Sequence, residues 1–402
     1  MRWFFLFCAL FQVPLVQAAD PLYEIELSVA GQGFDETFCW VHARAGVIPA
    51  KEPLVVMTLQ RLQLSGSDVF FALNTMRSKD LGKTWTPPQE HASFARKPFP
   101  WGGHEDLEIA VSDFWPEWHA ASGRLLGIGH TVVYEDGAVM KVRPRSTAYA
   151  VYDPAAASWS PWQILAMPDD PKFENAGAGC VQRVDLEDGT ILLPINFKIR
   201  DAEAYSTTVL RCGFDGTALR YLGHGSELTI SVKRGLYEPS LVRHGDRFFL
   251  TMRNDDHGYV SVSEDGQQFS EPVPWRFDDG SDLGNYNTQQ HWVAHRETLF
   301  LVYTRRGAGN DHVFRHRAPL FIARVDPETL RVVRASEQIL VPENGARLGN
   351  FGVTEVSAEE TWVTVTEWMQ GPGPKAHDTA PLVARGADNR IWVAKLKWKR
   401  EP

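Results

Sequence analysis

The residues best placed for chemistry are a glutamate and an arginine that stand fifteen positions apart, Glu238 and Arg253. Glu238 opens the strand-like run 238–242 (EPSLV), and Arg253 ends the strand-like run 247–253 (RFFLTMR). If the two runs pair as antiparallel strands, the start of the first and the end of the second lie at one edge of the sheet. A carboxylate can move a proton there, and a guanidinium can grip a carboxylate or sulfate with two hydrogen bonds. The spacing therefore places the two side chains at the same edge, where they could face a ligand or form a buried ion pair that braces the sheet.

Other side chains that could act with this pair are spread along the chain. The carboxylates available as an acid, a base or a nucleophile are Asp68, Asp106, Glu238 and Glu355. The basic residues of the segment 305–317 are Arg305, Arg306, His312, Arg315, His316 and Arg317. In a protein of net charge −9 they would form either a positive funnel for an anionic ligand or a solvated loop that neutralises nearby acids.

Two polar segments and one histidine add candidate contacts to a ligand. Segment 285–292 (NYNTQQHW) is too polar for an ordinary buried strand, which makes Gln289 a candidate. Segment 101–106 (WGGHED) brings His104 near a tryptophan that could stack on a sugar ring. His42 is a further candidate. Both histidines would otherwise be hydrogen-bonded structural residues.

The elements that must position these residues follow a weak internal repeat. Strand–turn–strand units recur around Asp80, Asp153, Asp215, Asp265, Asp326 and Asp388, at intervals of 50 to 73 residues. Further strand-like runs precede each turn, and no long amphipathic helix separates them. Six units of about four strands predict an all-β chain, a six-bladed β-propeller with four-stranded antiparallel blades. The competing interpretation is a pair of β-sandwiches.

The first residues have the pattern of a secretory signal peptide. The almost wholly apolar segment 3–16 follows a positive start and precedes a small-residue cleavage site near Ala18 or Ala19. Residues 1–19 would then be the signal peptide and residues 20–402 a single propeller domain. We expect a secreted or periplasmic protein without a membrane anchor.

The net charge bears on the partners of the protein, and the cysteines bear on its disulfides and metal sites. A net charge of −9 argues against a general affinity for nucleic acid or anionic lipid. Three cysteines, Cys39, Cys180 and Cys212, remain after cleavage, and the last two either form a disulfide or stay as buried thiols. No cysteine or histidine spacing indicates a zinc site, so we expect neither a metal nor another cofactor.

Two stretches of the sequence resemble the sialidase (neuraminidase) superfamily. Residues 78–85 (SKDLGKTW) match S-x-D-x-G-x-T-W, the Asp box of sialidases and other propellers, and residues 263–269 (SEDGQQF) are a degenerate copy one residue short. Residues 238–266 resemble one blade of a bacterial sialidase. The resemblance implies that Glu238 and Arg253 reach a central pocket, the arginine as a ligand of the substrate.

The resemblance implies further site residues. Sialidases hold the carboxylate of their sugar with three arginines from different blades, which here would be Arg44, Arg253 and Arg317. The acid/base aspartate of the family precedes the Asp-box strand, where this chain has Asp68, a residue that could equally be a solvated turn residue. Arg347, at the start of the sixth inner strand, is a further candidate ligand.

At the position of the nucleophile this sequence differs from the sialidase family. Sialidases attack the anomeric carbon with a tyrosine activated by the glutamate, because a carboxylate would repel the carboxylate of the substrate. The corresponding segment 347–355 (RLGNFGVTE) has Asn350 or Phe351 at this point. A relocated phenol nucleophile could be Tyr286 or Tyr303, the last tyrosine of the chain.

These observations predict a secreted sialidase-like glycoside hydrolase, an exo-glycosidase, that acts on acidic glycans carrying sialic, uronic or sulfated sugars. Asp68 would be the general acid and Glu238 the base or the activator of the nucleophile. Two alternatives stay open. A non-catalytic glycan-binding propeller would explain the missing tyrosine, and a polysaccharide lyase would use His42, His104 or Tyr303 against the C5 proton of a uronic acid. In each case the partner is an acidic oligo- or polysaccharide.

Overall fold

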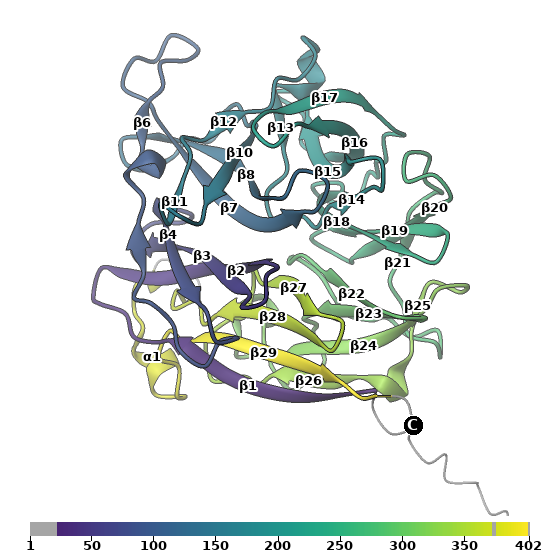
Figure 1. Ribbon diagram of the computed structural model, residues 1–402. Helices are drawn as coiled ribbons and strands as arrows, with labels where there is room; N and C mark the ends of the chain where they lie inside the picture. The colour runs from purple at the N-terminus through teal and green to yellow at the C-terminus, as the bar shows by residue number, and fades with distance from the viewer. Residues whose placement is uncertain (1–21, 372–374, 401–402) are drawn as a thin grey trace, which may run out of the picture.

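The computed structural model describes residues 22–371 and 375–400, and the signal peptide predicted at residues 1–19 lies outside them. The described residues form six antiparallel sheets around a common axis, so that the chain is a β-propeller (Figure 1). The prediction of an all-β propeller with antiparallel blades is therefore confirmed, and the two-sandwich interpretation is wrong.

The first three sheets follow one another along the chain. Sheet 1 consists of β2 (Phe38–Ile48), β3 (Leu54–Gln63), β4 (Phe70–Ser78) and β5 (Gln89–Glu90). Sheet 2 consists of β6 (Lys97–Pro98), β7 (Glu108–His119), β8 (Arg124–Glu135), β9 (Ala138–Val139), β10 (Thr147–Asp153), β11 (Ser158–Trp159) and β12 (Gln163–Ile164). Sheet 3 consists of β13 (Asn175–Gly177), β14 (Val184–Asp185), β15 (Thr190–Lys198), β16 (Ser206–Phe214) and β17 (Leu219–His224).

The other three sheets complete the ring. Sheet 4 consists of β18 (Tyr237–His244), β19 (Arg247–Arg253), β20 (Tyr259–Ser263) and β21 (Val273–Pro274). Sheet 5 consists of β22 (His291–His295), β23 (Thr298–Tyr303), β24 (Leu320–Asp326), β25 (Arg331–Val332) and β26 (Gln338–Val341). Sheet 6 consists of β27 (Gly352–Ser357), β28 (Glu360–Thr366), β29 (Ile391–Trp398) and β1 (Tyr23–Gly31).

Sheet 6 joins the two ends of the described chain. β1 pairs antiparallel with β29, and the two run side by side at the lower edge of Figure 1 in purple and yellow. Helices are short. They comprise α1 (Ala380–Val383) and the 3₁₀ turns Ala92–Phe94, Pro171–Phe173, Phe314–His316 and Arg334–Ser336. No helix of the described ranges is long and apolar enough to cross a bilayer.

The inner strands surround the axis, and the sheets pack on one another through aromatic side chains. β2 contacts both β7 and β27, and β18 contacts β22, which places the first main strand of these sheets next to the axis. Four tryptophans, Trp115, Trp275, Trp292 and Trp362, are fully buried. Cys39, Cys180 and Cys212 are buried free thiols, so Cys180 and Cys212 are not joined.

The turn that follows β4 shows how local sequence fixes the outer part of a sheet. The Ser78 hydroxyl donates to Asp80 Oδ1 over 2.8 Å and accepts from the Gly82 amide over 2.8 Å. Asp80 in turn accepts from the amide of Thr84 over 2.9 Å. The Trp85 ring then packs against Trp362 of sheet 6, with 6.2 Å between ring centroids. The turn therefore ties sheet 1 to sheet 6.

Replacing Gly82 by alanine is expected to lower the thermal unfolding midpoint more than replacing Gly137 by alanine. Both glycines have φ near +77° (77° and 76°), so both variants carry a left-handed alanine that costs about 1–2 kcal/mol. A Cβ at Gly82 would lie 2.9 Å from the Trp362 ring, whereas none of the described atoms lies within 4 Å of a Cβ at Gly137. Overpacking should add about 1–3 kcal/mol at Gly82 alone. Equal midpoints in thermal melts of the two variants would contradict this packing.

Candidate functional site at the propeller axis

Each sheet brings one residue with a left-handed backbone to the axis. These residues are His42, Asp113, Cys180, Glu238, Asn287 and Asn350, with φ between 45° and 62°, and we call them the central ring. The chain bulges at the first, second and fourth of them, where the pairing register of β2, β7 and β18 shifts. A bulge re-aims a side chain, and left-handed backbone at residues other than glycine gathers at functional sites. The central ring is therefore the candidate site.

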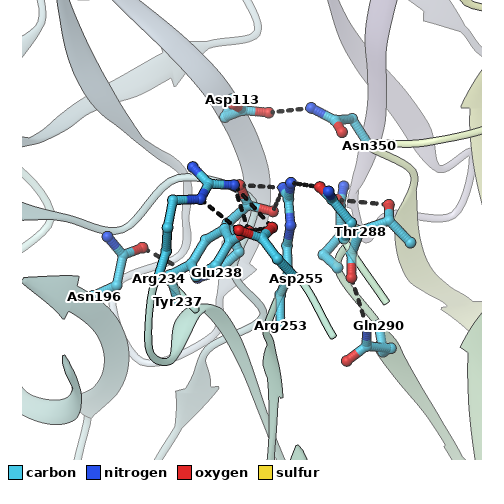
Figure 2. A network of polar contacts seen from close by, with 12 residues as sticks. Asp113, Asn196, Arg234, Tyr237, Glu238, Arg253, Asp255, Thr288, Gln290 and Asn350 are labelled. Carbon is cyan, nitrogen blue, oxygen red and sulfur yellow. Dashed lines mark hydrogen bonds and ion pairs between the residues drawn. The ribbon is translucent and has the colours of Figure 1, made fainter. Parts of the chain in front are cut away.

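Asp113 is the most densely contacted member of the ring. Its Oδ1 accepts from Arg44 Nη2 over 2.8 Å and from Asn350 Nδ2 over 3.3 Å, the second of which Figure 2 shows. Asn350 Nδ2 also lies 2.9 Å from His42 Nε2, which must accept because an amide nitrogen only donates. His130 Nε2 lies 3.7 Å from Asp113 Oδ2. One carboxylate from sheet 2 thus joins sheets 1, 2 and 6.

The ionisation of this cluster follows from its surroundings. Burial alone would raise the pKa of Asp113, but the neighbouring His42, Arg44 and His130 outweigh burial and hold its pKa well below the usual range. Burial lowers the pKa of His42, and lowers the pKa of His130 further. At neutral pH the cluster therefore holds an ionised aspartate between two neutral histidines.

Glu238 and Arg253 meet as the sequence predicts. Glu238 stands at the start of β18 and Arg253 at the end of β19, and Arg253 Nη1 lies 2.7 Å and 2.6 Å from the two carboxylate oxygens of Glu238. Arg253 Nη2 also donates to Asn287 Oδ1 over 2.6 Å. Behind the pair, Arg234 binds Asp255 (Figure 2). The pair lies at the axis, with Glu238 half-buried and Arg253 buried.

Arginines from three sheets crowd the same side of the axis. Arg317 donates from Nε to the carbonyl of Asn287 over 3.0 Å, and its guanidinium lies across Gly349. Burial first, and then Arg253, Arg347 and Arg315, hold the pKa of Arg317 well below its usual range. Burial and the positive charge of Arg315 lower the pKa of Arg347 to about 10. Such mutual repulsion between buried cations is relieved by an anion.

These arginines retain unused hydrogen-bond donors. The Nε atoms of Arg143, Arg145, Arg253 and Arg347 are buried and have no hydrogen-bond partner among the described residues. Burial first, and the neighbouring Arg145 second, lower the pKa of Arg143. The positive field reaches Tyr205: burial alone would raise its pKa, but Arg145 and other cations outweigh burial and lower it. The site is therefore built for a ligand that brings negative charge and acceptors.

Asp68 lies on the rim of this site. It is exposed, has φ 56°, and precedes β4, where the Tyr134 hydroxyl donates to its carbonyl over 3.1 Å. The negative charge of Asp68 partly offsets the burial that lowers the pKa of His42, Arg315 and Arg347. The structure therefore brings Asp68 near the central ring.

Arg44 is placed differently from the arginine clamp that the resemblance implies. The bulge between Val41 and Arg44 turns His42 into the central ring and leaves Arg44 fully buried against Asp113. The arginines that gather at the axis are Arg253, Arg315, Arg317 and Arg347. The predicted ligands Arg253, Arg317 and Arg347 are thus brought together, and Arg44 instead supports the carboxylate.

Four other predicted residues lie outside this cluster. His104 is exposed and pairs with a glutamate at 2.8 Å, and Asp106 is exposed in the same loop. Tyr303 is buried in the core of sheet 5, where its hydroxyl donates to Glu337 over 2.5 Å. Gln289 is fully buried beside its neighbour Thr288. Of the three residues that a lyase could use as its base, the structure places His42 in the central ring and the other two outside it.

Glu355 lines a separate cavity of about 290 Å³ at the end of the inner strands. Glu117, Gln182 and Trp292 also line this cavity. Burial raises the pKa of Glu117 to about 7 and also raises the pKa of Glu355. Within the described ranges neither carboxylate forms a hydrogen bond or an ion pair with a residue of the central ring, so we assign neither to the candidate site.

Asp113 and His130 are the site residues that sequence reasoning missed. Asp113 is a single acid inside the apolar strand segment 109–115 (IAVSDFW), and His130 stands likewise in 127–133 (GIGHTVV). A charged residue in a buried strand needs a partner, so this pattern is the signal that could have identified them. A Cβ at Gly179 would lie 2.0 Å from His130 Nδ1, so a glycine is needed beside the histidine. In the described ranges no group of three or more His, Cys, Asp or Glu side chains could hold a metal ion.

The fold defines the class of structure, a β-propeller whose similar solved structures include sialidases. A protein of unknown function from Dyadobacter fermentans has 15% identity and a TM-score of 0.59, over 93% of this chain and 99% of that one. The sialidase of Trypanosoma rangeli, solved with the inhibitor DANA, has 12% identity and a TM-score of 0.56. This match covers 89% of this chain and 55% of the sialidase, so the chain spans about half of that protein.

A third similar structure is the endosialidase of phage phi92, with 12% identity and a TM-score of 0.52 over 94% of this chain and 70% of that one. No protein family matches the sequence, and no curated protein does. At such identities the likeness concerns the fold.

Proposed function

We propose that this protein is an exported glycoside hydrolase that releases acidic sugars from glycans. The observation that carries the proposal is the group of buried arginines with unused donors, which stands beside two carboxylates, Glu238 and Asp68. Arg253, Arg317 and Arg347 would receive the anionic group of the sugar. Their fixed, planar donors match a carboxylate or a sulfate.

The carboxylates would supply the proton transfers. When the sugar acid occupies Arg253, this arginine is drawn toward the ligand, and Glu238 becomes free to act as a base. Asp68, exposed on the rim, would give a proton to the leaving oxygen as general acid. An acid and a base on the two sides of one glycosidic bond are the minimum for hydrolysis. Export is proposed from the signal peptide predicted at residues 1–19.

A product screen by mass spectrometry tests the proposal. The mature protein would be incubated with sialylated, uronic-acid and sulfated glycans, and the mass of each product compared with that of its substrate. Products that contain one added water would support a hydrolase and identify the sugar. Products without that water, absorbing in the ultraviolet, would contradict hydrolysis in favour of elimination.

The second candidate function is a glycan-binding propeller without catalysis. It is favoured by Asn350, which stands where sialidases carry their tyrosine, and by the ion pair that neutralises Glu238 in the free protein. Intact substrates across the screen, together with binding of acidic glycans in calorimetry, would select this function over hydrolysis.

Acidic sugars are expected to stabilise the protein against heat, and neutral sugars are not. Burial first, and then the repulsion by Arg253, Arg347 and Arg315, lower the pKa of Arg317. An anion at these arginines relieves the repulsion, so it binds the folded chain and not the unfolded one. A ligand at 100 times its Kd would add about 2.7 kcal/mol to the free energy of unfolding. Melting curves in glucuronate and in glucose, at equal ionic strength with sodium chloride, measure the difference. Equal midpoints would contradict an anion site.

A further inference from the structure

The central ring holds a carboxylate, Asp113, next to Asn350, the residue that stands where the sialidase resemblance leads one to expect a phenol. We infer that Asp113 is the nucleophile of this site, and that the substrate is a hexuronic acid, whose acidic group is not attached to the anomeric carbon. The inference rests on the proposed hydrolase function and deepens it. It replaces the relocated tyrosine with a group that the structure holds at the axis.

The contacts of Asp113 fix its carboxylate at the axis: the Cys180 thiol donates to it, as do Arg44 and Asn350. Oδ1 is held by Arg44 at 2.8 Å and by Asn350 at 3.3 Å. Oδ2 points toward His130, whose Nε2 lies at 3.7 Å, beyond hydrogen-bond length. The side chain of Asp113 is 9% exposed, so it meets the axis at one edge. Asn350 thus serves as a positioning residue for the carboxylate.

The charge of Asp113 suits a nucleophile better than a base. Its surroundings favour the ionised form strongly, so it has little tendency to accept a proton. An ionised carboxylate in a polar, hydrogen-bonded setting can instead face the positive charge that develops at an anomeric carbon. In the proposed reaction Asp113 therefore stays charged, whereas Asp68 and Glu238 exchange protons.

The same charge determines the substrate. A carboxylate nucleophile repels a substrate that carries a carboxylate on the anomeric carbon, as a sialic acid does. In a hexuronic acid the carboxylate is attached to C5, which the ring oxygen separates from the reacting carbon. Asp113 comes from sheet 2, whereas Arg317 comes from the loop between β23 and β24 of sheet 5 and Arg347 from the segment between sheets 5 and 6, so the two charges of the site also have separate origins around the axis. A carboxylate nucleophile that is separate from the arginines thus matches a uronic acid.

The reaction balances with the groups present. An electron pair of Asp113 Oδ2 forms a bond to the anomeric carbon while the bond from that carbon to the leaving oxygen breaks. The leaving oxygen takes a proton from the carboxylic acid of Asp68. A water molecule then attacks the anomeric carbon, gives its proton to Glu238 and releases Asp113, and the proton returns to Asp68 through solvent. The sugar keeps its anomeric configuration.

Covalent trapping in the wild-type protein tests the inference without a variant. The probe is the 2-deoxy-2-fluoro glycosyl fluoride of the uronic acid released in the product screen, and 2,3-difluorosialic acid is the comparison. We expect the first probe to add one 2-deoxy-2-fluoro-uronosyl mass to the peptide that contains Asp113, with a parallel loss of activity, and the second to add nothing. Label on another residue, label from the sialic acid probe, or release of sialic acid in the screen would overturn the inference. Release of no sugar at all would instead contradict the proposed function.

Two variants provide a second test. Glycine and asparagine both accept the φ of 53° at position 113, so Asp113→Gly and Asp113→Asn preserve the backbone. Both should lose at least about 10³-fold in turnover, and azide should restore turnover in Asp113→Gly and yield a glycosyl azide of inverted configuration. Asp106→Asn, in an exposed loop, is the control and should behave as wild type. A folded Asp113→Gly protein that forms no glycosyl azide would show a structural role and overturn the inference.

Discussion

The Glu238→Gln variant is expected to hydrolyse acidic glycans about 10²–10⁴ times more slowly than the wild type, while it binds them with unchanged affinity. The amide has the shape of the carboxylate and still accepts a hydrogen bond from Arg253, so the residues around the axis should keep their positions. It cannot accept a proton from water. Turnover should therefore fall without a matching change in Kd, as measured by hydrolysis kinetics and calorimetry on the same preparation.

Glu264→Gln is the matched control for this experiment. Glu264 is exposed in the turn after β20, outside the central ring, and its variant should keep wild-type kinetics. If Glu238→Gln hydrolysed its substrate at the wild-type rate, the assignment of Glu238 as a base would be wrong. If both variants bound glycan and neither they nor the wild type hydrolysed it, the binding propeller would be the correct function.

The Arg317→Met variant is expected to lose roughly 10- to 100-fold in affinity for the acidic sugar and to melt no lower than the wild type. Hydrogen bonds to a charged group contribute about 1.5–3 kcal/mol, which sets the size of the loss. Arg317 is buried among other arginines, so an apolar side chain of similar size removes repulsion from the free protein. Binding and stability should thus change independently, in calorimetry and in thermal melts.

Arg305→Met is the matched control, because Arg305 has a partner of opposite charge. Its guanidinium donates to both carboxylate oxygens of Glu337, over 2.8 Å and 2.7 Å. Removing Arg305 leaves a half-buried glutamate unpaired and should lower the melting midpoint, with no effect on glycan affinity. If Arg317→Met destabilised the protein as much as Arg305→Met and kept full affinity, Arg317 would be a structural residue.

Local patterns were sufficient to predict the propeller and the Glu238–Arg253 pair. Strand periodicity and turns rich in aspartate and glycine depend on neighbours in sequence, and Glu238 and Arg253 lie on two consecutive strands. The position of Asp68 before the β4 strand is local in the same sense. Such features need no knowledge of how distant sheets meet.

The carboxylate cluster could not be predicted in this way. Asn350 meets Asp113 across 237 positions and His42 across 308, so only closure of the ring brings them together. The exchange of roles between His42 and Arg44 depends on a bulge, since one extra residue in β2 moves a side chain to the other face. Tyr303 lies in the core because β23 is a middle strand, a position that composition does not reveal.

The left-handed backbone of the central ring has a consequence for protein engineering. Each non-glycine residue in this conformation is less favourable than glycine by about 1–2 kcal/mol, and the ring contains six of them. A library selected only for thermostability would therefore collect glycines at these positions and discard the polar groups. A library restricted to asparagine, aspartate, histidine and glycine, and selected for turnover, would instead redirect the chemistry of the axis while the strands that carry it stay the same.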